Sequence, residues 1–469
     1  MTRSVVSAIS ASREVVPEKN LPLQQSGSEP APIVLCNASY YGTLAAVRAM
    51  GRAGVPVVTV DPAVFAPGRY SRYASLHLSS PPFESDEWPD WLLELGRRGP
   101  RRAIYATSDA VSFALAEHRE QLGAVFDLYQ PELETMMSIL DKGLLIEHAR
   151  AVGIDCPETW FPRSSADVAA IASEFGGKFV AKPRSQLAVR TGTKGALIDA
   201  AVSDGVAEYE VLLRQGEDRS RFARRYRELT MPMLQRYHPE ALQKVYSLSG
   251  FRDRSGAHIV MRAAQKIMQR PRQLGVGLCF EEADIDPELA SRTILLCERI
   301  GYYGAFELEF ILSGGRPLLI DFNGRLYNQL AFDIARGMDL PRMVYAGATG
   351  QREKLARLVS DVPERERGGA LIFCNRLGLS LTVAAQRAFG RMSTEDASRW
   401  REWRRRANGR LVDAVHDADD PVPAYADAVQ QVLHAARHPR AFVRQMSSSV
   451  GQLATASLVA TTSLVASAT

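Results

Sequence analysis

Cysteine is scarce in this 469-residue sequence, and the few copies form no metal-binding pattern. The five cysteines are scattered, odd in number and without C-x-x-C spacing, which argues against a zinc site and favours a reducing compartment. A run of 18 apolar residues is also missing, so we expect no segment to span a membrane. Residues 1–30 hold charges, Pro and Gln but no apolar run of signal-peptide length. We therefore expect a disordered leader there and a cytoplasmic location.

A strong excess of charge of either sign is absent as well. Lys and Arg number 57 and Asp and Glu number 53, and a net charge of +4 over this length does not indicate a nucleic-acid partner. The content of 46% hydrophobic and 23% charged residues is typical of a soluble globular protein. A chain of this length predicts about two to four domains.

The first part of the chain alternates strands and helices. Residues 32–36 read as a buried strand, residues 43–51 as a helix and residues 54–61 as the next strand, and a further strand is expected over 102–106. This order predicts a Rossmann-like parallel sheet. The first loop, Asn37 to Gly42, lacks the G-x-G-x-x-G fingerprint, so we expect a structural or substrate-binding domain rather than a dinucleotide site.

Residues 301–328 read as two strands joined by a tight turn. A three-residue loop at 314–316 would place Glu309 opposite Asp321, whereas a two-residue loop would shift the register by one. In the first register two carboxylates and the amide oxygen of Asn323 converge, which is the oxygen-rich set that Mg²⁺ prefers. The alternative is that these acids form only the solvated face of a strand, although the surrounding apolar residues favour a buried sheet.

Two lysines precede this hairpin, and the first of them would by itself be read as a solvated side chain. Lys142 lies within helical periodicity over 132–152, and Lys182 ends a short strand over 178–183. The polar loop that follows, residues 185–195, has backbone amides and cations that suit phosphate, but it lacks a Walker-A pattern and could equally be an ordinary flexible loop.

The middle of the chain predicts further elements that lead into the hairpin. We expect one exposed, highly charged helix over 203–229 and a strand over 231–238 that contains Gln235. An antiparallel pair is expected over 245–251 and 258–265.

The order of these pieces resembles the ATP-grasp superfamily, in particular its carboxylate–amine ligase branch. The resemblance rests on Lys142, on Lys182 in F-V-A-K-P, on M-L-Q-R-Y around Gln235 and on the E-L-E-F…I-D-F-N-G-R hairpin, and it covers roughly residues 32–350. It implies an α/β fold, with an N-terminal Rossmann-like parallel-sheet domain, a two-lobed ATP-grasp module of α+β type and a helical C-terminal extension. The expected segments are 31–130 (N-terminal domain), 131–235 (small lobe with linking helix), 236–350 (metal-binding lobe), 351–446 (mainly helical extension) and 447–469 (disordered tail).

The resemblance also implies roles for individual residues. The expected ATP contacts are Lys142, Lys182, Lys194, Gln235, Arg236, Tyr237 and Glu240. The expected metal ligands are Glu309, Asp321 and Asn323, and the expected catalytic cations are Arg325, Lys266 and Arg262. Asp321 stands where the family usually has Glu, which leaves open whether it binds the metal directly. Glu307 is expected to be structural.

The activity implied by the resemblance is the joining of a carboxylic acid to an amine through an acyl phosphate, with ATP and Mg²⁺ (or Mn²⁺) and release of ADP and phosphate. The expected substrates are small molecules, amino acids above all, and the assembly could be a homodimer. Two alternatives stay open, which are an ATP-grasp carboxylase or phosphotransferase without an amine acceptor, and a non-catalytic nucleotide-binding module.

The C-terminal part contains an unusual basic segment. Residues 395–406 include five arginines together with Trp400 and Trp403, which share one helix face. We expect this face to pack on the rest of the protein, and the alternative is a basic helix that binds an anionic membrane or RNA.

Overall fold

The computed structural model describes residues 30–188, 195–199, 205–214, 220–271, 274–363, 371–407, 409–439 and 442–443. The expected leader up to residue 29, the loop cation Lys194 and the expected tail over 447–469 lie outside the described residues. No helix in the described part of the chain is both long and apolar enough to cross a bilayer.

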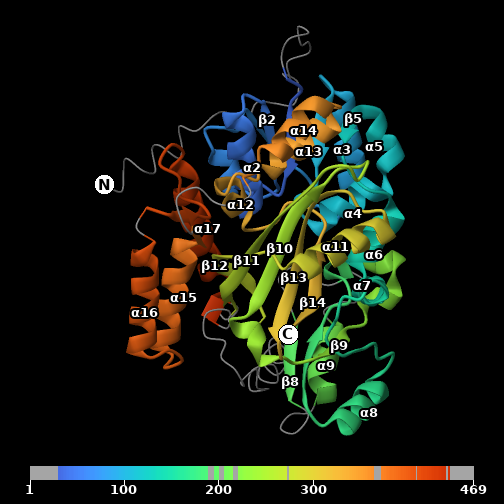
Figure 1. Ribbon diagram of the computed structural model, residues 1–469, viewed down its shortest axis with the longest axis vertical. Coiled ribbons are helices and arrows are strands. Elements are labelled where there is room, and N and C mark those ends of the chain that lie inside the picture. Colours follow the sequence, from blue (N-terminus) through green and yellow to red (C-terminus); the bar gives the residue numbers. More distant parts are fainter. Residues whose placement is uncertain are drawn as a thin grey trace, which may run out of the picture.

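The N-terminal part is a five-stranded parallel sheet of order β3-β2-β1-β4-β5, as the sequence predicts. Its strands are β1 (Ile33–Cys36), β2 (Val57–Val60), β3 (Leu76–Leu78), β4 (Arg102–Tyr105) and β5 (Phe126–Leu128). Its helices are α2 (Tyr41–Arg52), α3 (Trp88–Arg97), α4 (Asp109–Glu117) and α5 (Arg119–Val125). The three central strands are buried throughout, which explains why they read as continuous apolar runs. This sheet occupies the top of the molecule in Figure 1.

A small four-stranded sheet of order β6-β9-β7-β8 lies at the other end of the molecule (Figure 1). Its strands are β6 (Thr159–Trp160), β7 (Lys178–Lys182), β8 (Ala196–Asp199) and β9 (Met233–Arg236). Helices α8 (Ser165–Phe175) and α9 (Gly205–Arg214) pack beside it through a shared apolar cluster around Phe179 and Tyr209. The lysine predicted at the end of a strand, Lys182, is the last residue of β7.

A seven-stranded sheet of order β14-β13-β10-β11-β12-β15-β16 forms the centre of the protein. Its strands are β10 (Val245–Arg252), β11 (Ile259–Arg270), β12 (Val276–Ala283), β13 (Gly304–Ser313), β14 (Arg316–Asn323), β15 (Ile372–Cys374) and β16 (Leu411–Asp413). One face packs α6 (Leu133–Leu140), α7 (Lys142–Ala151) and α11 (Pro287–Ile300) through apolar residues that include Leu308 and Phe310. Since successive side chains alternate along β13, the acidic residues Glu307 and Glu309 belong to the opposite face.

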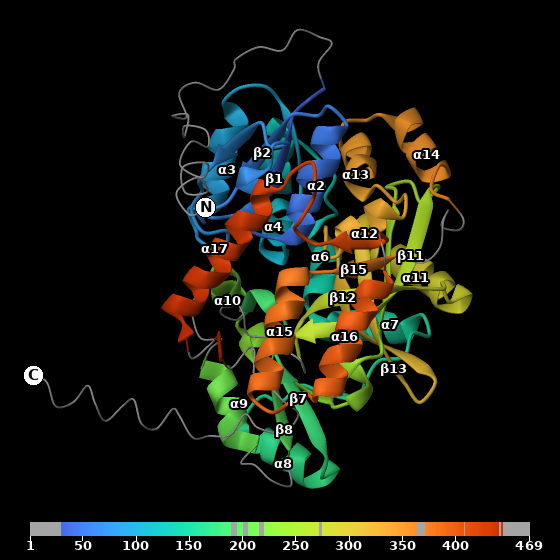
Figure 2. The same ribbon diagram turned by 90° about the vertical axis from the view of Figure 1, so that its left-hand side faces the viewer.

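The chain beyond residue 350 is built into this sheet rather than appended to it, because β15 and β16 are its last two strands. The remaining helices are α10 (Arg221–Arg225), α12 (Leu330–Ala335), α13 (Leu340–Ala348), α14 (Arg352–Ser360), α15 (Arg376–Ala388), α16 (Thr394–Arg406) and α17 (Val422–Arg437). Figure 2 shows α15, α16 and α17 covering one side of the molecule from the central sheet to the N-terminal domain.

The tryptophan face of α16 packs on the protein, which confirms the packing interpretation of the basic segment. Trp400 and Trp403 contact each other edge to face at 5.6 Å and join an apolar cluster with Met268 and Leu379. The Trp403 indole also donates a hydrogen bond to the Glu281 carboxylate at 2.5 Å. A membrane or RNA is therefore not needed to bury these rings.

Two predicted helices are wrong in their extent. The helix expected over 132–152 is two helices, α6 and α7, because Asp141 breaks the first and caps the second through a 2.8 Å bond from the Gly143 amide. The single exposed helix expected over 203–229 is divided into α9, α10 and a short 3₁₀ turn at Arg227–Thr230. Phe222 in α10 and Leu229 in the turn are buried, and these apolar residues bind the segment to the core.

Candidate active site

The β13–β14 hairpin brings the predicted metal ligands together. Glu309 lies opposite Asp321, which is the pairing expected for a three-residue loop. The loop nevertheless has only two residues, since Ser313 pairs with Arg316. A bulge at Ile320 in β14 inserts the extra residue that restores the register. Directly paired residues share a face of the sheet, so the carboxylates of Glu309 and Asp321 adjoin on the face opposite the apolar core.

Each of these carboxylates pairs with a lysine from a different element. Lys142 Nζ lies 2.6 Å from Asp321 Oδ1, and Lys266 Nζ of β11 lies 2.6 Å from Glu309 Oε1. Both lysines are nearly buried, with side chains 8% and 5% exposed, whereas Asp321 is 31% exposed. The two adjoining carboxylates are therefore flanked by one lysine on each side.

The position of Lys142 is fixed by a residue pair that sequence reasoning missed. Lys142 is the first residue of α7, and its amide donates to the Arg184 carbonyl at 3.1 Å. The Arg184 guanidinium in turn holds both oxygens of the N-cap residue Asp141, at 2.6 and 2.7 Å. An aspartate directly before a helix is a common N-cap, so the residue before Lys142 carried a usable signal.

Lys182 adds a third ammonium to this group. Its Nζ reaches the Ile320 carbonyl at 3.4 Å. Burial, together with the nearby charge of Lys142, lowers the pKa of Lys182 to about 7, although the carboxylates of Asp321 and Glu309 act in the opposite direction. The ammonium is therefore easily deprotonated until a further negative charge approaches.

Glu307 lies on the same face but is held inside the protein. Its carboxylate accepts hydrogen bonds from Ser247 Oγ at 2.7 Å, from Asn323 Nδ2 at 3.2 Å and from Gln329 Nε2. Burial and the neighbouring charge of Glu309 raise the pKa of Glu307 to about 7. The expectation that Glu307 is structural agrees with this arrangement, while Ser247 and Gln329 were not singled out as its partners.

Arg325 connects the hairpin with the N-terminal domain. Its guanidinium donates to Asn323 Oδ1 at 2.8 Å and to Asp109 Oδ1, at the start of α4, at 2.6 Å. The glycine before it, Gly324, is required by close packing, since a Cβ there would lie 2.3 Å from the Ile139 side chain. Asp109 was not predicted as a site residue, because no sequence pattern links it to a residue 216 positions away.

The loops around Asp109 lie where the parallel strands of the N-terminal sheet end. Ser108 caps α4 and donates to Asn37 Oδ1 at 2.7 Å, and Asn37 has a left-handed backbone with φ of 52°. Asp61, at the end of β2, accepts from the Ser39 amide at 2.8 Å. These loops form an ordered polar edge, which the contact between Asp109 and Arg325 joins to the hairpin. Ligands of parallel sheets commonly bind at the carboxyl ends of the strands.

The predicted nucleotide contacts at the end of β9 lie on a connection between the two lobes. Gln235 is buried and bonds Thr159 Oγ1 at 3.0 Å, whereas the Arg236 side chain is exposed and stacks over Phe175. Tyr237 continues the strand through a 2.9 Å bond from its amide to the Lys178 carbonyl.

Glu240 lies just beyond this connection. It is joined to His238 through Ser313, whose Oγ lies 3.2 Å from Glu240 Oε1 and 2.9 Å from His238 Nδ1. Three enclosed polar atoms here, Tyr237 Oη, His238 Nε2 and Glu240 Oε2, have no hydrogen-bond partner in the described part of the chain.

Arg262 is placed differently from the other predicted cations. Its guanidinium is buried and donates to the main-chain carbonyls of Arg336, at 3.3 Å, and Pro363. These contacts join β11 to the segment after α12, and none of them involves another predicted site residue. A catalytic role for Arg262 therefore stays a prediction.

No known family model and no curated protein matches the chain, but solved structures do. The biotin carboxylase domain of the 2-oxoglutarate carboxylase from Hydrogenobacter thermophilus, in complex with MgADP, ADP and bicarbonate, matches with a TM-score of 0.56 and 17% identity over 74% of this chain and 75% of that one. Biotin carboxylase from Campylobacter jejuni matches with a TM-score of 0.54 and 16% identity, over 75% of this chain and 76% of that one. N5-carboxyaminoimidazole ribonucleotide synthetase from Thermus thermophilus matches with a TM-score of 0.50 and 15% identity, over 72% of this chain and 82% of that one. The chain has the ATP-grasp fold.

The likeness of these ATP-grasp structures is one of architecture, since the identities are 15–17%. It confirms the predicted fold class, a parallel N-terminal sheet followed by two further sheets.

The donor set fits a magnesium ion that arrives with phosphates. Glu309 and Asp321 supply carboxylate oxygens from paired strands, and Asn323 supplies an amide oxygen. In the described part of the chain, no group of three or more His, Cys, Asp or Glu side chains could hold a metal by itself. Two carboxylates beside several ammonium groups are instead suited to a cation that shares its coordination with phosphate oxygens.

Proposed function

We propose that this ATP-grasp chain is an ATP-dependent ligase that joins a carboxylic acid to an amine. In the proposed reaction the carboxylate attacks the γ-phosphorus of ATP, the bond to the β-γ bridging oxygen breaks and ADP leaves. The resulting acyl phosphate is attacked by the amine, and phosphate leaves with formation of the amide. The substrates are small molecules, for which amino acids are the first candidates.

The observation that carries this proposal is the arrangement of charge at the hairpin, where two adjoining carboxylates are each paired with a lysine. Lys142, Asp321, Glu309 and Lys266 are linked in two pairs at 2.6 Å, and Lys182 adds a third, easily titrated ammonium. When bound, Mg²⁺ would be held by Glu309 and Asp321 and would neutralise phosphate charge. The lysines are then available to bind the phosphate oxygens, because charge neutralisation and positioning are the main requirements of phosphoryl transfer.

The acid and the amine are proposed to bind between Arg325 and the N-terminal edge. Arg325 is the cation next to Asn323 on the hairpin, and its partner Asp109 starts a helix of the N-terminal domain. A guanidinium in this place can hold the carboxylate and then the acyl phosphate. The loop at Asn37 would contribute contacts that select the substrate.

A carboxylase is the second candidate, because matched structures are biotin carboxylases and one of them contains bicarbonate. In that reaction bicarbonate would take the place of the organic acid, and the same cations would bind it. A cytoplasmic location and a homodimer remain predictions from the sequence.

The decisive experiment measures ADP, AMP and phosphate after incubation with ATP, Mg²⁺ and pools of carboxylic acids and amines. ADP release that needs both an acid and an amine is the expected result. Release that needs bicarbonate would favour the carboxylase, and AMP formation would contradict both reactions.

The Glu309→Gln variant tests the metal assignment. Removing one anionic ligand should lower turnover by at least about a hundredfold, since metal ions supply several kcal/mol of charge stabilisation and each 1.36 kcal/mol is tenfold. Glu353→Gln, the same change at a side chain that is 93% exposed on α14, is the matched control and should retain activity. Full turnover by Glu309→Gln would refute the proposed role of this carboxylate.

A further inference from the structure

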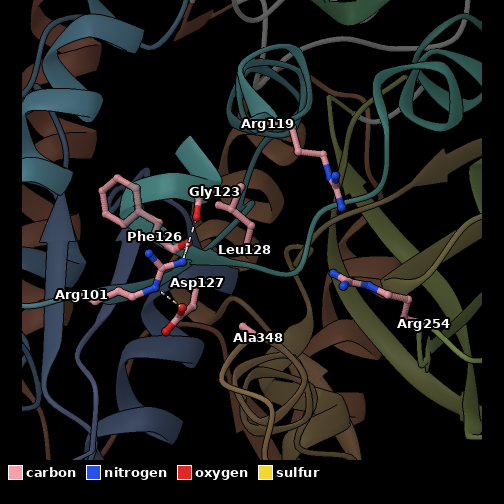
Figure 3. Close-up of a pocket in the computed structure, with 8 residues that line it drawn as sticks. All are labelled: Arg101, Arg119, Gly123, Phe126, Asp127, Leu128, Arg254 and Ala348. Atoms are coloured by element: carbon pink, nitrogen blue, oxygen red, sulfur yellow. Dashed lines mark hydrogen bonds and ion pairs between the residues drawn. The ribbon is translucent and has the colours of Figure 1, made fainter. Parts of the chain in front are cut away.

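A concavity lies away from the hairpin, at the side of the N-terminal sheet. It has a volume of about 260 Å³ and is lined by residues that include Arg101, Arg119, Asp127 and Arg254. The strand at its floor, β5, is the edge of the five-stranded sheet. None of the residues predicted for the ATP site lines it, so any ligand it binds would occupy a separate place (Figure 3).

Arg254 is the cation best prepared for a ligand. It lies in the turn between β10 and β11, and its guanidinium is 4.8 Å from the ring centre of Tyr303 and 5.5 Å from that of Tyr129. The main-chain amide of Arg254 also donates a hydrogen bond to the Tyr129 hydroxyl at 2.9 Å, which positions the residue. Within the described residues the guanidinium itself has no carboxylate or carbonyl acceptor. Its contacts with the two rings fix its plane.

Arg119 approaches from the opposite wall. It is the first residue of α5, and its Nε donates to the Gln130 carbonyl at 3.0 Å. Its Nη1 pairs at 2.7 Å with Glu132, whose side chain is 68% exposed and so weakly held. Figure 3 shows the guanidinium groups of Arg119 and Arg254 pointing toward each other across the concavity.

Arg101 differs from these two because its donors are already used. It pairs with Asp127 at 2.5 Å and donates to the carbonyls of Gly123, Ala124 and Phe126 at the end of α5. Its role is therefore to close that helix end and to neutralise Asp127. The uncompensated positive charge of the concavity comes from Arg254, with a share from Arg119.

We propose that this concavity binds a small phosphate-bearing molecule, either free phosphate or a phosphate monoester. A phosphoryl group has three terminal oxygens and a charge near −2, so it can accept hydrogen bonds from two planar guanidiniums on opposite sides. A carboxylate has one charge and two oxygens, and the two carboxylates of a dicarboxylate lie on separate carbons, so neither offers both guanidiniums three oxygens on one centre. The volume of about 260 Å³ is many times the space that one water needs, so phosphate or a small phosphate monoester fits.

Such a ligand would connect two parts of the protein. Arg119 belongs to the N-terminal domain, whereas Arg254 belongs to the central sheet, in the turn after the strand that carries Ser247. Binding would therefore hold the N-terminal domain against the lobe that contains the hairpin. The inference goes beyond the proposed ligase function and does not depend on it.

Thermal unfolding and calorimetric titration of the full-length chain test the proposal, with inorganic phosphate, glycerol 3-phosphate and succinate as separate probes. A ligand at free concentration c that binds only the folded state stabilises it by RT ln(1 + c/Kd), so the melting temperature keeps rising with the logarithm of the ligand concentration above Kd. Either phosphate probe should raise the melting temperature by a few degrees and give a saturable calorimetric isotherm, and succinate should give at most a weak response in both. The stronger of the two phosphate probes distinguishes free phosphate from an ester.

The variants Arg254→Gln and Arg119→Gln should each weaken this binding at least tenfold. Any phosphate that enters the ATP site contributes equally in the wild type and in both variants, so the difference from the wild type reports the concavity alone. Arg399→Gln, on α16 at the opposite side of the molecule, is the matched control and should bind as the wild type does (Figure 1).

Arg254→Lys is the control for a folding defect, because it keeps the positive charge at this position and removes only the planar guanidinium. It should fold and bind phosphate at least several-fold more weakly than the wild type. Equal responses to phosphate in the wild type and in both glutamine variants would overturn the proposal. A response to succinate as strong as that to the phosphate probes would also overturn it, as would no response to any probe.

Discussion

Raising the pH from about 7 to about 9 should weaken nucleotide binding, because Lys182 loses its proton over this range in the free protein. Burial and the charge of Lys142 lower the pKa of Lys182 to about 7. Phosphates bound beside the ammonium would raise its pKa toward the ordinary value of about 10.4. Binding is therefore linked to the uptake of a proton at Lys182.

The size of the effect follows from the fraction of Lys182 that is charged. For a pKa of about 7 this fraction is about 0.5 at pH 7, about 0.09 at pH 8 and about 0.01 at pH 9. The apparent Kd increases in inverse proportion to the competent fraction, so it should rise about fiftyfold from pH 7 to pH 9. At pH 8 binding should take up about 0.9 proton per nucleotide.

Calorimetry with a non-hydrolysable ATP analogue and Mg²⁺, in buffers of different ionisation enthalpy, measures both quantities. The second pKa of a phosphate is about 6, so the nucleotide itself is already ionised throughout this range. Lys182→Arg keeps its charge at every pH used and should bind with a nearly constant Kd. Lys178→Arg, at the exposed start of the same strand, is the matched control and should keep the wild-type slope.

Glu307 also has a pKa of about 7, so Glu307→Gln must be titrated in parallel. Its Kd should still rise with pH, because Lys182 is intact. A wild-type Kd that does not change above pH 7 would refute the assigned pKa. A slope that disappears in Glu307→Gln but persists in Lys182→Arg would show that the carboxyl group, and not the ammonium, is the titrating group.

Two further predictions concern stability. The folded-state pKa of Glu307, about 7, exceeds the ordinary value of 4.5, so the carboxyl ionises first in the unfolded chain and the free energy of unfolding should fall as the pH rises from 4.5 to 7. Urea unfolding of Glu307→Gln should lack this fall. Identical pH profiles of the unfolding free energy for the wild type and the variant would contradict the prediction. Asp420→Ala should lower the free energy of unfolding by about 3–5 kcal/mol, because it leaves the nearly buried guanidinium of Arg48 without its 2.9 Å partner. The exposed neighbour Asp419→Ala should cost less than about 1 kcal/mol in the same urea titration, and equal losses would refute the argument.

The hairpin shows how far sequence reasoning reached and where it stopped. Side-chain alternation placed Glu309 and Asp321 on one face, and the turn residues located the loop. The route to the register was different from the one expected, since a two-residue loop and a bulge at Ile320 replace the three-residue loop. A bulge has no reliable sequence signal here, because Ile320 is an ordinary strand residue between Leu319 and Asp321.

The partners of the site residues were largely beyond sequence reasoning for a different reason. Asp109 meets Arg325 across 216 positions, and Ser247 meets Glu307 across 60. Such pairs depend on how the N-terminal sheet docks on the hairpin and on which strand neighbours β13. Local periodicity sets neither of these, whereas it did predict most individual strands and the packing of the tryptophan face of α16 on the protein.

The C-terminal segment helps to position the proposed substrate site, although it lies far from the other residues of that site in the sequence. Tyr41 follows the loop at the carboxyl edge of the N-terminal sheet, and its hydroxyl donates to Asp427 of α17 at 3.0 Å. The pair of Arg48 and Asp420 anchors the same helix, α2, to the chain just before α17. Since Arg325 holds the other side of this edge through Asp109, the loops that would face the acid and the amine are positioned from both sides. The chain after residue 350 therefore supports both the central sheet and the edge at which we propose that the substrates bind.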